Sequence, residues 1–140
     1  MIKKISIVIL IIIIILLAVF VPIIPVPLPD GVWTKKEFHD AHSDLKKITD
    51  KLYFIEPDSD DLYYIRIHYG EMNMRKSLLG LRTGKYTQST AQYSCWVPKT
   101  CPHLVYEPRE TKIGHAYLRP DKLDDFMNWA KAQLAKGEMK

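Results

Sequence analysis

The chain has 140 residues, a formal net charge of +4 and a hydrophobic content of 47%. All 16 of its Asp and Glu residues, and 18 of its 20 Lys and Arg residues, lie after residue 29, so this part carries a formal charge of only +2. Such a weak charge does not provide the basic surface that nucleic-acid binding requires, and we expect no nucleic-acid partner.

Residues 5–24 form an uncharged, strongly apolar run with a single serine. A helix of this length covers about 30 Å, which matches the hydrocarbon thickness of a bilayer. The run is longer than the apolar part of a typical cleaved signal peptide, and no small-residue cleavage motif follows it. We predict a short stub at residues 1–4 and a single-span membrane anchor at residues 5–24, with a cleaved signal peptide as the alternative.

Charges beside the anchor predict its orientation. Lys3 and Lys4 precede the apolar run, whereas Asp30 is the one charged residue between Pro22 and Thr34. Because cytoplasmic flanks are enriched in Lys and Arg, we expect the N-terminus inside the cytoplasm. The predicted location is the inner (cytoplasmic) membrane, with the C-terminal domain outside the cytoplasm, in the periplasm.

Residues 25–33 are rich in proline and predict an extended spacer between the anchor and the domain. Proline fixes φ and lacks an amide donor, so this stretch cannot continue the helix. In polyproline form the stretch from Pro22 to Pro29 would raise the domain by some 20–25 Å, at ~3.1 Å per residue. The domain itself is predicted over residues 34–140.

The domain is predicted to begin with a helix. Thr34 and Glu37 have the spacing of a capping box, in which each side chain binds a backbone amide of the first turn. Apolar residues then recur every three or four positions, which predicts an amphipathic helix over residues 35–52. The apolar positions are Phe38, Ala41, Leu45, Ile48 and Leu52.

Two chemical hypotheses arise in and after this helix. His39 and His42, with Asp44, could form half of a metal site, but nothing else at a defined spacing completes the ligand set. We therefore expect neither a metal nor a cofactor. Acidic residues follow at positions 56–61. Tyr63 and Tyr69 occupy the positions where a calcium-binding EF-hand needs Gly and Glu, so a solvated turn is predicted.

The middle of the domain predicts strands and the end predicts a helix. Residues 62–69 alternate between two faces and predict a strand with Tyr64, Arg66 and His68 on one face. Residues 86–97, which are rich in Tyr, Thr, Ser and Gln, predict a long strand, and residues 104–106 and 113–118 predict two short ones. A turn is predicted at 108–112, and residues 72–81 remain ambiguous. Pro120 and two following acids predict a final helix over residues 121–136. The predicted fold class is α+β: a helix, about four antiparallel strands and a helix.

Cys95 and Cys101 enclose a five-residue loop. In the oxidising compartment inferred from the membrane orientation, a structural disulfide is the preferred interpretation. The alternatives are free thiols, or a nucleophilic Cys101 with His103 as its base.

No catalytic or family motif is recognised, so a non-enzymatic function is the preferred interpretation and an enzyme is the alternative. We expect a membrane-tethered, protein-binding domain, either an accessory subunit of a membrane complex or an immunity-type inhibitor. Its predicted contacts with a protein partner or lipid headgroups are basic residues, namely Arg66, Arg75, Lys76, Arg82 and Lys85.

Two alternatives belong to other functional classes. The first is a small envelope enzyme with His68, His103 or His115 as general base, because histidine titrates near neutral pH. The second is a glycan- or peptidoglycan-binding module, because eight tyrosines and three tryptophans suffice for an aromatic binding surface.

Overall fold

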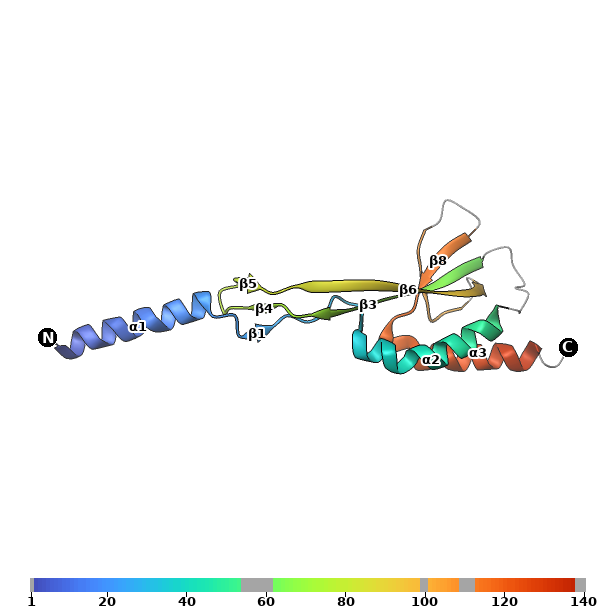
Figure 1. Ribbon diagram of the computed structural model, residues 1–140, viewed down its shortest axis with the longest axis horizontal. Helices are drawn as coiled ribbons and strands as arrows, with labels where there is room; N and C mark the ends of the chain where they lie inside the picture. Colours follow the sequence, from blue (N-terminus) through green and yellow to red (C-terminus); the bar gives the residue numbers. More distant parts are fainter. Residues whose placement is uncertain (1, 54–61, 99–100, 109–112, 138–140) are drawn as a thin grey trace. The chain divides into compact units, whose positions relative to one another are not determined.

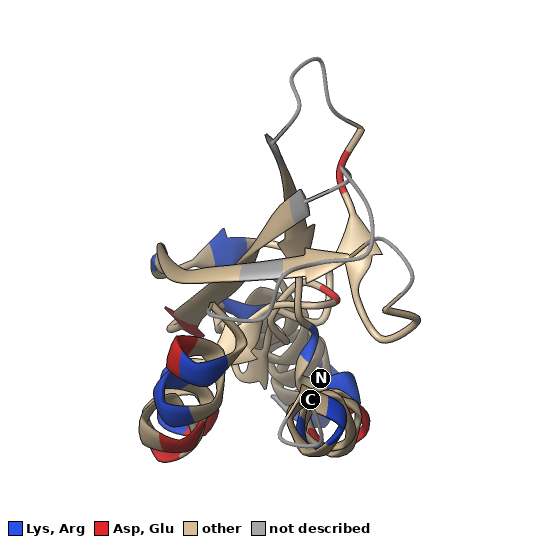
Figure 2. Ribbon diagram, turned by 90° about the vertical axis from the view of Figure 1, so that its right-hand side faces the viewer, with Lys and Arg blue, Asp and Glu red and all other residues tan. Residues whose placement is uncertain are grey.

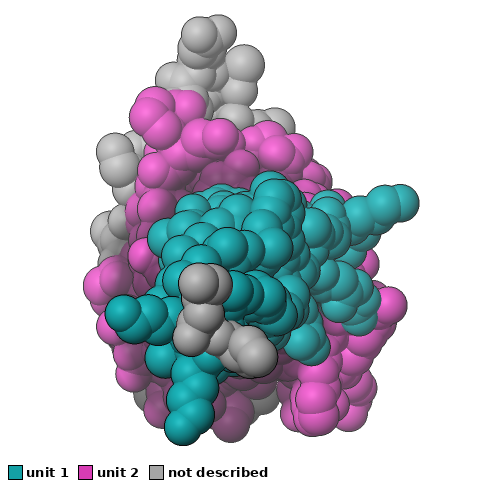
Figure 3. Space-filling view, turned by 90° about the vertical axis from the view of Figure 1, so that its left-hand side faces the viewer, with its two compact units in different colours: residues 1–27, 71–87 teal, residues 28–70, 88–140 magenta. Residues whose placement is uncertain are grey.

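The computed structural model of the protein describes residues 2–53, 62–98, 101–108 and 113–137. The acidic turn predicted at 56–61, and the predicted turn at 108–112 apart from Pro108, lie outside these ranges. The chain divides into two compact units (Figure 3). Unit 1 comprises residues 1–27 and 71–87, and unit 2 comprises residues 28–70 and 88–140.

Unit 1 begins with helix α1, Ile2–Phe20. Its segment Lys3–Phe20 has a mean hydropathy of 2.9 and none of it is buried, so the helix is long and apolar enough to cross a membrane. A signal sequence would have the same properties. The helix ends before the apolar run does, because Pro22 offers no amide and disfavours helical geometry at Val21.

The proline-rich segment of unit 1 is paired with another strand. Strand β1, Ile24–Pro25, lies antiparallel to β4, Arg75–Lys76, which in turn pairs with β5, Arg82–Thr83. The Val26 amide donates to the Met74 carbonyl at 3.0 Å. Ile24 and Val26 are half-buried, while Pro25 and Pro27 are exposed. Proline has no amide to donate to a neighbouring strand, so it is tolerated here because β1 lies at the edge of its sheet.

Unit 2 contains the predicted amphipathic helix as α2, Lys35–Leu52. Thr34 Oγ1 accepts from the Glu37 amide at 3.1 Å, and Glu37 Oε2 accepts from the Thr34 amide at 2.9 Å, which confirms the capping box. The second helix is α3, Leu123–Gly137, and it follows a 3₁₀ turn, η1, at Pro120–Lys122. The α+β class and both helices are therefore confirmed.

A mixed sheet of five strands completes unit 2. Its strands are β2 (Trp33–Thr34), β3 (Leu62–Met72), β6 (Tyr86–Pro98), β7 (Val105–Tyr106) and β8 (Ile113–Tyr117), of which β3 and β6 extend into unit 1. The order is β2-β3-β8-β7, and β6 pairs separately with β3.

The prediction of an antiparallel sheet is wrong for two pairs. β2 and β8 both run parallel to β3, whereas β7 and β8 are antiparallel. Side-chain bonds from Arg66 to Gln92 and from His68 to Thr90 show that β6 runs back along β3. Since β6 occupies one edge of β3, the later β7–β8 hairpin pairs at the other edge, where β8 runs in the direction of β3.

Helices α2 and α3 lie on the same side of this sheet (Figures 1 and 2) and their apolar faces meet it. Trp33 is 1% exposed, and its Nε1 donates to the Leu118 carbonyl at 2.7 Å, which ties β2 to the end of β8. The sheet contributes the inward-facing positions of its strands to the core. These are Tyr63, Ile65, Ile67, Tyr93, Cys95, Val97 and Ala116, and Leu118 joins them immediately after β8.

Candidate functional site

The face of the sheet opposite the two helices carries a group of polar and aromatic side chains. Neighbouring residues of a strand point to opposite faces of the sheet, so the members of this group on each strand lie at every second position. Tyr64 is paired in register with His115, and Arg66 with Tyr117. We call this surface the open face; its residues are Tyr64, Arg66, His68, Thr90, Gln92, Glu107, His115 and Tyr117.

An aromatic pair and a carboxylate organise one half of the open face. The rings of His68 and Tyr117 are stacked with centroids 4.7 Å apart. The Tyr117 hydroxyl donates to Glu107 Oε2 at 3.2 Å, and His115 Nδ1 lies 3.8 Å from the same oxygen. The contacts bring together residues of β3 and β8 with the residue that follows β7.

The other half links β3 to β6. Arg66 Nε donates to Gln92 Oε1 at 3.0 Å, and His68 Nδ1 lies 2.9 Å from Thr90 Oγ1. These bonds hold the side chains in defined positions while Thr90 and Gln92 remain exposed. The open face therefore presents hydrogen-bonding groups in a fixed arrangement, as recognition of another molecule requires.

The three histidines considered as general bases are placed differently. His68 and His115 lie on the open face, whereas His103 lies in the segment between Cys101 and β7. His68 is within hydrogen-bonding distance of Thr90, but in the part of the chain that the structure describes no carboxylate is paired with its ring. At 3.8 Å, His115 and Glu107 are beyond the range of a direct hydrogen bond. The arrangement offers recognition groups more readily than a triad of nucleophile, base and orienting acid.

The predicted disulfide is not formed: Cys95 and Cys101 are both free and both fully buried. Each thiol has its own neighbours, because Cys95 lies against the backbone of Ile65 while Cys101 lies against His103 and Tyr106. The Tyr106 hydroxyl also donates to the Cys101 carbonyl at 2.7 Å and lies 3.0 Å from the Pro98 carbonyl oxygen. Backbone and tyrosine hydrogen bonds thus hold this segment without a covalent link.

Burial raises the pKa of the Cys95 thiol to about 12, and burial likewise raises the pKa of Cys101. The nucleophilic form of cysteine is the thiolate, so neither residue suits a catalytic thiol at neutral pH. The environment of these residues is that of packed core side chains.

We expect both thiols to resist alkylation in the folded protein. Iodoacetamide at pH 8 should add no carbamidomethyl group under native conditions and two after unfolding in urea, as counted by intact-protein mass spectrometry. The reason is that buried, protonated thiols are neither accessible nor nucleophilic. A protein that takes up no label even after unfolding, and takes up two only after added reductant, would show the disulfide instead.

His39 and His42, the two histidines considered as metal ligands, both contact aromatic residues. His42 Nδ1 lies 2.8 Å from the Tyr93 hydroxyl, and the His39 ring contacts the edge of Tyr69 at a centroid distance of 6.3 Å. Within the described ranges no three His, Cys, Asp or Glu residues converge as metal ligands would. Burial raises the pKa of Tyr93 to about 12, so this phenol is a hydrogen-bonding group and not an anionic ligand at neutral pH.

The five predicted basic contact residues do not belong to one unit. Arg66 belongs to the open face of unit 2. Arg75, Lys76, Arg82 and Lys85 belong to unit 1, on and beside β4 and β5. The structure therefore divides the predicted set into an arginine within a hydrogen-bonded sheet face and a cluster near the end of a hairpin.

A shallow groove lies between α2 and α3. Its larger section has a volume of about 420 Å³, and a neighbouring section of about 380 Å³ shares Asp44, Met127 and Lys131 with it. Leu45, Ile48, Leu123 and Leu134 supply apolar walls. Charged residues of both signs border the groove, which has no converging catalytic groups among the residues described.

Four residues of the open face were not recognised from the sequence: Thr90, Gln92, Glu107 and Tyr117. The alternation of His115 and Tyr117 with small residues was a usable signal, since it puts both side chains on one face of a strand. The sequence around Glu107 did not indicate a place on this face, because the location of Glu107 depends on how β7 pairs with β8.

Unit 2 is thus a two-layer α+β domain, with two helices on one face of a mixed sheet. Comparison with protein-family models, with curated proteins and with solved structures finds no match to this chain.

Proposed function

We propose that the protein is a membrane-anchored binding domain that recognises a partner protein through the open face of unit 2. In this proposal α1 stays in the inner membrane with its N-terminus in the cytoplasm, and unit 2 works in the periplasm as an accessory subunit or an immunity-type inhibitor. The two lysines before the apolar run and the uncharged segment after it support this orientation.

The observation that carries the proposal is that, among the residues described, α2 and α3 cover one face of the mixed sheet and the open face lies on the opposite side. All-parallel sheets normally have both faces covered, whereas sheets that contain antiparallel pairs commonly leave one face to solvent, so a mixed sheet can present a face for recognition. Here the second face is occupied by half-buried and exposed polar side chains that are already hydrogen-bonded to one another. Preorganised side chains lower the entropic cost of binding, so this face suits a protein partner.

Tethering makes even modest affinity useful. A domain held at a membrane meets other membrane proteins at a high effective concentration, because the second contact becomes intramolecular. Arginine and tyrosine are enriched among the residues that dominate binding energies, and Arg66 and Tyr117 occupy paired positions on the open face.

The proposal is tested by site-specific photo-crosslinking in cells. We expect a protein in which Tyr117 is replaced by p-benzoylphenylalanine to form an adduct of one discrete mass on irradiation. The same replacement at Tyr53, which lies at the end of α2 and is 46% exposed, serves as the control and should not form this adduct. Arg66→Glu should lower the adduct yield roughly fivefold or more, because loss of an anchoring arginine commonly costs over 1 kcal/mol.

Two results would contradict the proposal. One is the absence of any adduct from position 117 while the protein is present in the membrane fraction. The other is an identical pattern of adducts from positions 117 and 53, which would indicate random collision.

A glycan ligand is the second candidate, and it is favoured by the stacked His68 and Tyr117 rings beside polar groups. Aromatic side chains next to hydrogen-bonding groups offer an apolar surface with polar handles. Retention of the full-length protein on purified peptidoglycan, abolished by Tyr117→Ala and not by Tyr53→Ala, would favour the glycan over a protein partner.

A further inference from the structure

The turn that joins β4 to β5 in unit 1 carries three exposed leucines. Leu78, Leu79 and Leu81 are 64%, 71% and 46% exposed. Turns normally carry polar residues, glycine or proline, so adjacent leucines at the outermost positions are unusual. A water-exposed group of this kind typically marks a contact with another apolar medium.

The backbone holds these leucines at the end of the hairpin. The Ser77 carbonyl accepts from the Gly80 amide at 3.0 Å, and the Ser77 hydroxyl accepts from the Leu81 amide at 3.0 Å. Gly80 has a φ of +94°, a conformation that glycine adopts without strain. Polar backbone groups are therefore bonded within the turn, which lowers the cost of moving it into a less polar environment.

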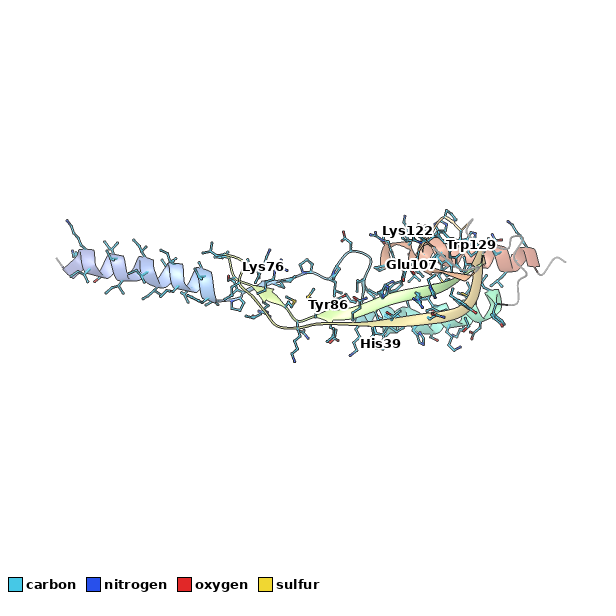
Figure 4. The ribbon with its side chains drawn as sticks, turned by 90° about the horizontal axis from the view of Figure 1, so that it is seen from above. His39, Lys76, Tyr86, Glu107, Lys122 and Trp129 are labelled. Carbon is cyan, nitrogen blue, oxygen red and sulfur yellow. The ribbon has the colours of Figure 1, made fainter. Side chains whose placement is uncertain are left out.

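The strand register places this turn at the α1 end of the hairpin. β1 begins four residues after the last residue of α1 and leads away from the helix. β4 is antiparallel to β1, with Ile24 opposite Lys76 and Pro25 opposite Arg75, so β4 runs back towards α1. The leucines follow immediately after β4. Figure 4 shows Lys76 near the end of α1.

The charges around the turn are uniformly positive. Between residues 73 and 85 the chain has Arg75, Lys76, Arg82 and Lys85 and no acidic residue. Arg75, Lys76 and Arg82 all lie on β4 and β5, within three residues of a leucine of the turn. Apolar residues flanked by basic ones match the border of a bilayer, where acyl chains meet anionic headgroups.

We propose that residues 77–81 form a second membrane contact, in which Leu78, Leu79 and Leu81 enter the headgroup region of the bilayer spanned by α1. Arg75, Lys76 and Arg82 bind anionic lipid headgroups beside them. The contact rests on the proposed anchoring by α1. It adds a second point of attachment for unit 1, since a hairpin paired with the segment after α1 reaches the same membrane surface.

The test uses the full-length protein in vesicles of phosphatidylcholine, with or without phosphatidylglycerol. A fluorescent NBD group is attached at Leu79→Cys, or at Thr87→Cys as a control in an exposed position of β6 in the same unit. Cys95 and Cys101 are both replaced by alanine in both variants, so that the introduced cysteine is the sole thiol. Circular dichroism of each variant checks that it is folded.

We expect the label at position 79 to be blue-shifted and quenched by lipids that carry a nitroxide near the headgroup, while the label at position 87 stays water-exposed. Quenching at 79 should increase when phosphatidylglycerol is present. Each single replacement of a basic residue of the turn by glutamine should lower the fraction of protein whose turn contacts lipid roughly fivefold, as measured by quenching at position 79. The replacements are Arg75→Gln, Lys76→Gln and Arg82→Gln.

Flotation and resistance to alkaline extraction report on α1 separately. If the protein floats with the vesicles but positions 79 and 87 are equally exposed to water, the turn does not contact lipid and the further proposal is overturned, while anchoring stands. If the protein does not float, both proposals fail. Quenching at 79 that is independent of phosphatidylglycerol would overturn the role of the basic residues.

Discussion

Replacing Trp33 by alanine is expected to lower the free energy of unfolding of unit 2 by about 4 kcal/mol or more. Trp33 is 1% exposed and packs in the core immediately before the cap of α2. Its removal leaves a large cavity and also deprives the buried Leu118 carbonyl of its donor, which adds on the order of 1–3 kcal/mol. Because small domains are stable by only about 5–15 kcal/mol, Trp33→Ala should come close to unfolding the unit.

Urea unfolding of the full-length protein in detergent micelles, followed by far-UV circular dichroism, measures this loss. Trp33→Phe keeps most of the ring volume and removes the indole donor, so it should give an intermediate loss that isolates the bond to Leu118. Trp129→Ala is the matched control, since Trp129 is only partly buried and should cost less. Equal losses for Trp33→Ala and Trp129→Ala would contradict the central position of Trp33 in the core.

Raising the pH from 9 to 12 is expected to destabilise unit 2 strongly. Burial raises the pKa of Cys95 from 9.0 to about 12. The pKa of Tyr93 is raised from 10.0 to about 12, mainly by burial and secondly by the charge of the nearby Cys95 thiolate. The unfolded chain releases these protons at lower pH than the folded chain does. In this window the unfolded state therefore binds fewer protons, and stability falls as pH rises.

The stabilising contribution of Cys95 is fully present below pH 9 and is lost as the pH rises to about 12. One pKa unit corresponds to about 1.4 kcal/mol, so Cys95 alone accounts for a loss on the order of 4 kcal/mol over this range. The pKa of Tyr106 is also raised, mainly by burial, and acts in the same direction.

Urea midpoints measured at intervals between pH 8 and pH 12 test the effect. Cys95→Ala should be somewhat less stable at pH 8, because it removes core volume, but its stability should fall less steeply with pH. If the wild type and Cys95→Ala show the same pH dependence, Cys95 does not titrate as its burial requires. A constant stability up to pH 12 would contradict the expected effect altogether.

Local signals predicted the helical parts of the protein well. The capping residues Thr34 and Glu37 and the apolar spacing up to Leu52 all act within a few turns of one helix, so α2 was predicted with its observed bounds. The start of α3 was predicted less accurately, because the 3₁₀ turn η1 occupies Pro120–Lys122 and the α-helix begins only after it. The apolar run likewise identified α1, although Pro22 ends the helix sooner than hydrophobicity alone suggested.

The candidate site was predicted only in part. Arg66, His68 and His115 were recognised as residues of interest, and the alternation along β3 correctly put Arg66 and His68 on one face. Their neighbours could not be inferred, because Gln92 and Tyr117 reach them through pairings between strands that are far apart in the sequence. The prediction of a disulfide differs from the structure for a similar reason: loop length does not specify the core packing around each buried, unbonded cysteine.

By itself, the sequence determined the apolar N-terminal helix, the capped amphipathic helix and the alternating strands, since these depend on residues only a few positions apart. The tertiary structure alone decided that β8 runs parallel to β3, that the two thiols are buried without a covalent link, and that the open face combines three strands. Those features depend on which distant segments share an edge or a core, and local patterns do not contain that information.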